Sequence, residues 1–322
     1  MTERERFIKA LERKPLTGRV PHFELIFFPT MQVFGKVHPL HRRYEQWDQM
    51  QENERKLHRE EIADIYLAIA KTFSHSAIFL MTNFLTNNAN NIEEEFNLID
   101  TIRKKMGDQY FLMMHGDATF PIPSGSDMLK FTYRLHDEPE AVKNEAYENV
   151  MRKLDRAYQL HNYGGLDGFA LCTDYCLNTG PYLSPTLFAE FITPYLQKLI
   201  TGYRQLGFYT IKHTDGNIMP ILDQLMEVRP DAIHSLDPQA GVDIAEMKRL
   251  VGNKMCLIGN VNCGLLQTGT DDEVVKSIRY ALQNGMPNGG YIFSTSNCIY
   301  PGMSLSRYEL MLNIWNQEGI YL

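Results

Sequence analysis

Short apolar runs alternate along the chain with stretches of helical periodicity. Eight of these runs are rich in apolar and β-branched residues and predict strands at residues 20–25, 77–80, 110–114, 168–172, 208–212, 232–235, 255–259 and 291–294. Between the strands, apolar residues recur every three or four positions and so fall on one face of a helix, most clearly at 187–203. Regular alternation of strands and helices predicts a parallel sheet covered by helices.

Several predicted helices have recognisable capping residues. Ser184 precedes Pro185, which predicts a helix that begins at the proline. Thr270 and Glu273 have the spacing of a capping box, which predicts another helix start. Gly252 stands shortly before the seventh predicted strand, where we expect a residue with left-handed backbone geometry to end the helix.

The number and order of the elements predict the fold class. Eight strand–helix units in 322 residues suit a closed (β/α)8 barrel of the TIM type better than an open doubly wound sheet, and no Gly-x-Gly-x-x-Gly motif follows the first strand. The residues before Val20 and the polar passage at 37–61 lack the bias of a linker, so we expect them to add helices. The prediction is an α/β protein with one barrel domain over residues 1–322 and an N-terminal helical extension.

Composition and charge exclude several classes of protein. The chain has 32 Lys and Arg against 39 Asp and Glu, a net charge of −7, and therefore no basic surplus for nucleic acid or for a polybasic membrane contact. No apolar run reaches the roughly 20 residues that span a bilayer, and the first residues lack the apolar stretch of a secretory signal. We therefore expect a cytoplasmic protein. Its five scattered cysteines favour free thiols over disulfides.

Polar residues follow the predicted strands. In a parallel barrel the carboxyl ends of all strands open onto one mouth, so residues just after the strands converge there. The residues at these positions are Glu24, Asn83, His115, Asp117, Asp174, Asn178, His213, Asp215, Asn217, Asp237, Asn260, Asn262, Asn297 and Cys298. Asn and Asp also favour turns and helix caps, which is the alternative explanation for any one of them. For the whole set we expect a site at the mouth.

His213 and Asp215 are the most informative pair in this set. A histidine and a carboxylate two residues apart at a strand end can face one site, and we expect Asp174 to take part in the same chemistry. Zinc would need a third and a fourth ligand, for which Cys298, Glu24 and Asp174 are available. The alternative is a metal-free site in which His213 and Asp215 bond to each other or to substrate, because no compact metal-binding motif is present.

Aromatic residues surround Glu24. With Met31, the residues Phe23, Phe27, Phe28 and Phe34 form a group that suits a flat apolar or aromatic ligand, and ordinary packing between barrel and helices is the alternative. We expect the substrate to contact Glu24, Phe23, Phe27, Asn83, His115, Asp117, Asn178 and Asn297.

A series of motifs along nearly the whole chain marks a family likeness. The chain resembles the uroporphyrinogen decarboxylase superfamily, including its corrinoid-linked methyltransferase branches. The motifs that carry the resemblance are Met-Thr-Glu-Arg-Glu-Arg-Phe at 1–7, Arg-Val-Pro at 19–21, Asn-Thr-Gly-Pro-Tyr-Leu-Ser-Pro at 178–185, His-Thr-Asp-Gly-Asn at 213–217, Gly-Val-Asp-Ile at 241–244, Gly-Asn-Val at 259–261 and Gly-Gly-Tyr-Ile at 289–292. The resemblance implies a (β/α)8 barrel.

The chain departs from the decarboxylase pattern. Members that decarboxylate uroporphyrinogen have an arginine-rich segment after the first strand, which holds the acidic side chains of the tetrapyrrole. Here the place is taken by Glu-Leu-Ile-Phe-Phe at 24–28, an acidic and apolar segment. The aspartate expected after the second strand is absent around Asn83, and Asn297 replaces a late histidine. The resemblance therefore disfavours porphyrinogen decarboxylation.

The zinc methyltransferases of the superfamily have His-x-Cys at the fifth strand and a second Cys near the eighth. This chain keeps His213, has Asp215 at the first Cys position, and has Asn297 at the second with Cys298 one residue later. The resemblance implies zinc held by His213, Asp215 and Cys298. Such zinc activates the heteroatom that carries a methyl group, so that a Co(I) corrinoid on a partner protein takes the methyl.

These arguments predict a methyltransferase. We expect it to move a methyl group from a small methyl ether, aromatic ethers included, to a corrinoid protein, with zinc assistance. Two rival functions remain: a metal-free decarboxylase of another acid, which would need a basic anchor in its pocket, and a non-catalytic barrel that binds a ligand or a corrinoid partner.

Overall fold

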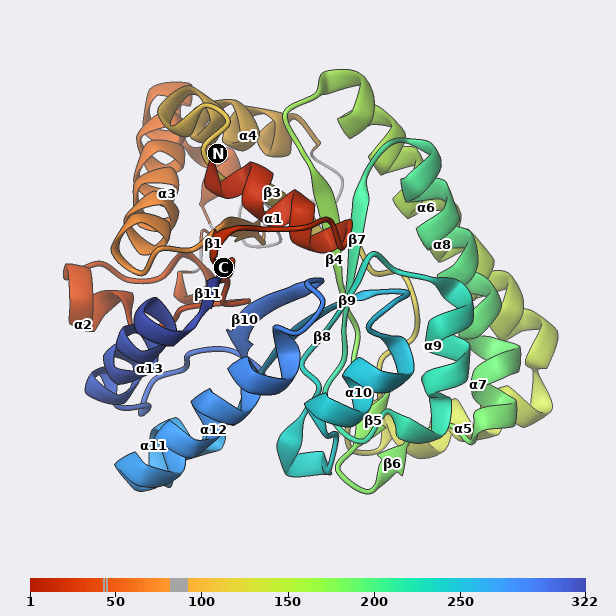
Figure 1. Ribbon diagram of the computed structural model, residues 1–322. Helices are drawn as coiled ribbons and strands as arrows, with labels where there is room; N and C mark the ends of the chain where they lie inside the picture. The colour runs from red at the N-terminus through yellow and green to blue at the C-terminus, as the bar shows by residue number, and fades with distance from the viewer. Residues whose placement is uncertain (43, 45, 82–91) are drawn as a thin grey trace.

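Seven parallel strands form one strongly curved sheet in the part of the chain that this computed structural model describes, residues 1–42, 44, 46–81 and 92–322 (Figure 1). Their order is β10-β9-β8-β7-β4-β3-β2. The strands are β2 (Ala77–Leu80), β3 (Phe111–His115), β4 (Gly168–Cys172), β7 (Tyr209–His213), β8 (Ala232–His234), β9 (Cys256–Val261) and β10 (Tyr291–Thr295). They confirm seven of the eight predicted strands to within one or two residues at each end.

The remaining predicted strand, residues 20–25, is the first in the sequence. It closes the barrel without forming a regular strand. His22 makes a parallel bridge with Phe293 of β10, and the Phe293 N–H donates to the Pro21 carbonyl at 2.8 Å. On the other side, the Ser76 N–H just before β2 donates to the His22 carbonyl at 2.6 Å. The ladder does not extend in either direction, because Pro21 has no N–H to donate on one side and the Glu24 side chain accepts the Thr295 N–H on the other. The sheet is thus closed into the predicted (β/α)8 barrel.

Helices surround the sheet, and α1 and the short strand pair β1–β11 lie across one end of it (Figure 1). The helices are α1 (Glu3–Leu11), α2 (Thr30–Phe34), α3 (Glu52–Thr72), α4 (Ile92–Met106), α5 (Asp127–Asp137), α6 (Pro139–Tyr163), α7 (Pro185–Phe191), α8 (Thr193–Gln205), α9 (Leu222–Val228), α10 (Ile244–Val251), α11 (Cys263–Thr268), α12 (Asp271–Gly285) and α13 (Leu305–Glu318). Two short antiparallel pairs complete the fold, β1 (Gly18–Arg19) with β11 (Ile320–Tyr321), and β5 (Cys176–Leu177) with β6 (Gly180–Pro181). In the described ranges, no helix combines the length and the apolar character needed to cross a membrane.

The polar passage at 37–61 differs in part from the prediction. It contains two 3₁₀ turns, Pro39–His41 and Trp47–Gln49, and becomes α-helical only at Glu52. Pro39 occupies the first position of the first turn, which fits a short turn better than a helix interior.

The predicted capping residues explain where two helices begin. The Ser184 hydroxyl accepts from the Leu187 N–H at the start of α7, and Thr270 and Glu273 form a complete capping box at the start of α12. The prediction for Gly252 is wrong. Its φ of −62° is right-handed, because the chain continues α10 into one more turn, with the Gly252 N–H bonded to the Lys248 carbonyl, before β9.

Replacing Thr270 by Ala should lower the free energy of unfolding by about 1 kcal/mol, because it leaves the Glu273 N–H in the first turn of α12 without its side-chain acceptor. Thr101→Ala is the matched control, since Thr101 lies inside α4 and bonds only the preceding turn through the Asn97 carbonyl. Urea denaturation of both variants measures the difference. Equal stabilities for the two variants would contradict the capping assignment.

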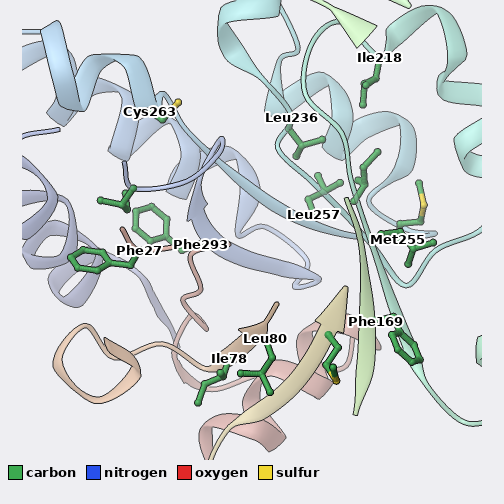
Figure 2. Packing of buried hydrophobic residues seen from close by; sticks show 14 of the residues in the cluster. Phe27, Ile78, Leu80, Phe169, Ile218, Leu236, Met255, Leu257, Cys263 and Phe293 are labelled. Atoms are coloured by element: carbon green, nitrogen blue, oxygen red, sulfur yellow. The ribbon is translucent and has the colours of Figure 1, made fainter. Parts of the chain in front are cut away.

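Buried side chains divide between the barrel interior and the layer between sheet and helices. Alternate strand residues point to opposite sides, so Phe111, Met113 and Ile211 fill the interior while Leu112 and Met114 face the helices. Figure 2 shows members of the outer cluster, among them Ile78, Leu80 and Leu257. Because His213 follows Ile211 by two residues, its side chain continues the interior row toward the carboxyl end of the barrel.

Candidate metal centre at the carboxyl end of the barrel

Three of the predicted residues converge where β4 and β7 end. His213 Nε2 lies 3.7 Å from Asp215 Oδ1 and 3.9 Å from Asp174 Oδ1. One ligand atom from each of these three side chains lies within 4.8 Å of the others. The imidazole is buried, whereas the two carboxylates are partly exposed, with 27% of the Asp215 side chain and 49% of the Asp174 side chain accessible. The cluster therefore faces the open end of the barrel.

Close contact between two loops brings the carboxylates together. The Asp215 N–H donates to Asp174 Oδ1 at 2.9 Å, which ties the loop after β7 to the loop after β4. Gly216 has a φ of +80°, and a Cβ on it would lie 2.4 Å from the Cys176 carbonyl oxygen. Glycine is thus required for the loop carrying Asp215 to pack against the β5–β6 hairpin.

The Asp215 carboxylate is held on both of its oxygens. The Ser235 hydroxyl donates to Oδ1 at 2.7 Å, and the Asn297 side-chain amide donates to Oδ2. Burial, together with the negative charges of Asp174 and Asp237, raises the pKa of Asp215 to about 7 in spite of the Ser235 hydrogen bond. Burial and the neighbouring negative charges thus favour the protonated form of Asp215 below about pH 7.

A second histidine, His234, holds the imidazole of His213 in place. His213 Nδ1 lies 2.7 Å from Nδ1 of His234, a hydrogen bond that leaves Nε2 facing the carboxylates. Burial lowers the pKa of His213 to about 4, with the Lys212 charge acting in the same direction and Asp174 against it. The ring is neutral at neutral pH, which is the form that binds a metal. One imidazole nitrogen and two carboxylates are a donor set that suits zinc.

Cys298 is not part of this cluster. Among the described His, Cys, Asp and Glu side chains, the group close enough to share one ion contains Asp174 where we predicted Cys298. Burial raises the pKa of the Cys298 thiol to about 12, with Glu24 and Asp215 adding to the shift. The structure thus groups His213 and Asp215 with Asp174, and ligation by Cys298 stays a prediction.

Two members of the predicted aromatic group, Phe23 and Phe27, lie in the hydrophobic core. Phe23 is 1% exposed inside the barrel, and Phe27 is 2% exposed, with its ring 4.5 Å from that of Phe73. Glu24 is also buried and accepts hydrogen bonds from Ser294 and Thr295. Packing therefore accounts for both phenylalanines, and neither is placed to contact a substrate at the mouth.

Burial raises the pKa of Glu24 to about 8 in spite of its hydrogen bonds to Thr295 and Ser294. Between these two pKa values the Glu24 carboxyl is protonated in the folded protein but ionised in the unfolded chain, where its pKa is near 4.5. Folding stability must fall as pH rises through this window. From about pH 6 to about pH 8, the parent should lose roughly 2 kcal/mol relative to Glu24→Gln. Urea denaturation tests this, with Glu54→Gln as an exposed control, and a parallel pH dependence of parent and Glu24→Gln would contradict it.

Asp117 is engaged in a buried ion pair. Its Oδ2 lies 2.8 Å from Lys212 Nζ, and neither side chain is exposed. Lys212 Nζ also donates to the Leu171 and Thr173 carbonyls and lies over the Tyr175 ring. Burial alone would raise the pKa of Asp117, but the Lys212 charge and the hydrogen bonds hold it at about 2. The sequence offered one signal for this pair, a lysine inside an otherwise apolar strand.

The remaining predicted residues have separate positions. His115 ends β3, and burial lowers its pKa to about 4. Asn178 is exposed in the turn between β5 and β6, and Asn83 lies outside the described residues. Asn297 joins the cluster through Asp215. Of the predicted substrate-contacting residues, Asn297 is the one that touches the cluster among those the structure describes.

A pocket of about 590 Å³ opens beside Asp117, between α4, α6 and the loop after β3. Its lining residues are Ile92, Glu95, Asp117, Ala118, Thr119, Asn149, Arg152, Lys153, Asp155, Arg156 and Gln159. A pocket of about 670 Å³ lies at the opposite end of the barrel, against Leu16 and Tyr321, far from the cluster. Neither of these two pockets is lined by Asp174, His213 or Asp215.

The architecture and the cluster together define a (β/α)8 barrel protein with a candidate metal centre at the carboxyl ends of its strands. Residues 145–317 match the family model described as Uroporphyrinogen decarboxylase (URO-D), and the chain belongs to this family. This agrees with the resemblance inferred from the sequence motifs.

Individual relatives support the same assignment. The chain is 28% identical over 219 residues to a uroporphyrinogen decarboxylase of Shewanella loihica and 22% identical over 215 residues to one of Thioalkalivibrio sulfidiphilus. Each match covers 63% of this chain and 57% of the relative's length. A solved methyltransferase from Methanosarcina mazei has a similar fold, with a TM-score of 0.74, 18% identity and coverage of 98% of this chain and 99% of that one.

Proposed function

We propose that this protein is a zinc-dependent methyltransferase that moves a methyl group from a small methyl ether to a corrinoid carried by a partner protein. The observation that carries the proposal is the convergence of Asp174, His213 and Asp215 at the mouth of the barrel. The whole-length similarity in fold to the Methanosarcina methyltransferase supports it. A cytoplasmic location and the corrinoid partner are parts of the same proposal.

His213 Nε2 and one oxygen each of Asp174 and Asp215 would hold the zinc ion. Bound zinc would supply Lewis-acid activation of the heteroatom that carries the methyl group. The protein's own groups orient the ligands in advance. Ser235 and Asn297 hold Asp215 by its two oxygens, and the Asp215 N–H holds Asp174. Because Phe23 and Phe27 are buried in the core, the structure gives no preference for an aromatic ether.

A methyl-transfer assay tests the proposal. The purified protein with zinc, free cob(I)alamin as acceptor and a panel of methoxylated aliphatic and aromatic compounds should give the absorbance change of methyl-cobalt formation for at least one donor. We expect His213→Ala to abolish this signal. No methylation by a zinc-loaded parent over the panel would contradict the proposal.

A second function is favoured by one specific observation, two of the cationic side chains in the lining of the pocket beside Asp117, which also contains acidic residues. Arg152 and Lys153 of α6 both line it, and Lys153 makes no hydrogen bond or ion pair with any residue that the structure describes. Such an anchor would suit a carboxylate substrate and a decarboxylase activity. Release of CO₂ from small polycarboxylates, lost in Lys153→Met and retained in His213→Ala, would favour this function over methyl transfer.

A further inference from the structure

A chain of hydrogen bonds leads from His213 away from the metal centre into the barrel wall. His213 Nδ1 contacts His234 Nδ1 at 2.7 Å, His234 Nε2 contacts Ser294 Oγ at 3.3 Å, and Ser294 Oγ donates to Glu24 Oε2 at 3.3 Å. The four side chains come from β7, β8, β10 and the closing segment 20–25. All four residues are at most 5% exposed. We call them the hydrogen-bond chain.

The contact between the two histidines fixes where protons lie. A hydrogen bond between two Nδ1 atoms requires that one of them carries the proton and the other accepts it. If His213 Nε2 binds a metal through its lone pair, the proton of His213 must sit on Nδ1. His234 Nδ1 is then the acceptor, and His234 carries its own proton on Nε2.

The contacts at the Glu24 end of the hydrogen-bond chain favour the same placement of the protons. With its proton on Nε2, His234 donates to Ser294 Oγ, and the Ser294 hydroxyl is free to donate to Glu24. Oε2 of Glu24 also receives the Thr295 hydroxyl at 2.5 Å, so this oxygen acts as an acceptor. A Glu24 carboxyl that holds a proton fits this placement when the proton is on Oε1, because Oε2 accepts both hydroxyls.

The register of the sheet holds the two rings in contact. His213 and His234 are direct neighbours in the parallel ladder of β7 and β8, and their ring centroids are 4.9 Å apart. The burial of both rings excludes water as a competing partner for the Nδ1 atoms. The contact between His213 and His234 is therefore set by the register of β7 and β8.

We propose that His234, Ser294 and Glu24 are positioning residues that fix the Nδ1–H tautomer of His213 and so present Nε2 to the metal. This inference rests on the proposed metal centre of Asp174, His213 and Asp215. It assigns a role to His234, which contacts the His213 ring, and to Ser294 and Glu24, which follow His234 in the hydrogen-bond chain. Partners of this kind orient a ligand and raise its basicity, and their loss weakens metal binding by about 10-fold to 100-fold.

Zinc affinity, measured by competition with a chromophoric chelator, tests the role directly. Ser294→Ala and His234→Gln should each weaken zinc binding by about 10-fold to 100-fold, whereas Ser294→Thr, which keeps a hydroxyl, should stay within a fewfold of the parent. Ser76→Ala is the matched control. It removes another buried serine–glutamate hydrogen bond, to Glu3 Oε2 at 2.6 Å, at the amino end of the barrel and should leave the zinc affinity unchanged.

Two spectroscopic readouts separate positioning from general destabilisation. Histidine-selective ¹⁵N NMR of the zinc-loaded parent should show the His213 proton on Nδ1, and the Co(II)-substituted Ser294→Ala protein should have an altered ligand-field spectrum. If Ser294→Ala and His234→Gln both bind zinc as tightly as the parent does, the inference is overturned, whereas the proposed metal centre is not. A parent that binds neither zinc nor cobalt would instead overturn the proposed function itself, and the inference with it.

Discussion

Replacing Lys212 by Met is expected to lower the free energy of unfolding by about 3–5 kcal/mol, because it leaves the Asp117 carboxylate buried without its partner. The ammonium group also donates hydrogen bonds to the Leu171 and Thr173 carbonyls, and the substitution removes both of these bonds. Urea denaturation of the purified variant measures the loss.

Two comparisons make this result specific. The double variant Lys212→Met/Asp117→Leu removes both charges and should recover a large part of the lost stability, since an apolar pair of similar volume avoids the unpaired charge. Lys130→Met removes a lysine from an exposed pair with Asp127 at 3.1 Å and should change stability by less than about 0.5 kcal/mol. A Lys212→Met variant as stable as Lys130→Met would show that the buried pair does not hold the loops after β3 and β4 in place.

Replacing Asp215 by Asn is expected to weaken zinc binding by at least about 100-fold. Loss of a residue that only orients a ligand costs up to about 100-fold, and loss of a charged ligand should cost at least as much. Asn keeps the size of the side chain and can still accept from the Ser235 hydroxyl, but it lacks the negative charge that attracts the ion. Isothermal titration with zinc chloride measures the difference.

Asp237→Asn is the control for the removal of a nearby charge. Asp237 lies close enough to raise the pKa of Asp215, but it caps the 3₁₀ turn Pro238–Ala240 and is not one of the three clustered ligands. Its substitution should change the zinc affinity only fewfold. Equal losses for the two variants would mean that general electrostatics at the mouth, and not ligation by Asp215, accounts for binding.

The sequence pattern was sufficient for most of the fold because the interior strands of a parallel barrel are continuous apolar runs. It failed where backbone chemistry interrupts the ladder. Residues 20–25 have the right composition, but Pro21 and the Glu24 side chain limit the strand to one bridge, with His22 as the paired residue. The backbone of Gly252 depends on the turn into β9, which no local rule describes.

The candidate site was predictable to the level of strand ends and no further. His213, Asp215 and Asp174 follow two strands that are neighbours in the sheet, so the barrel brings them together. The direction of each side chain depends on register, and a shift of one residue turns a side chain from the mouth into the wall. The structure places Phe23 in the inner core of the barrel, and the group of three ligand atoms does not include Cys298.

The central claim is that Asp174, His213 and Asp215 form a zinc site, and the most direct test is the metal content of the protein purified without chelators or metal-affinity resin. Elemental analysis should find about one zinc per chain in the parent, as expected for one site of this donor type, and none above background in His213→Ala. His136→Ala, which changes an exposed histidine of α5, should retain the zinc of the parent. A folded parent that contains no zinc and takes up none on addition would contradict the account.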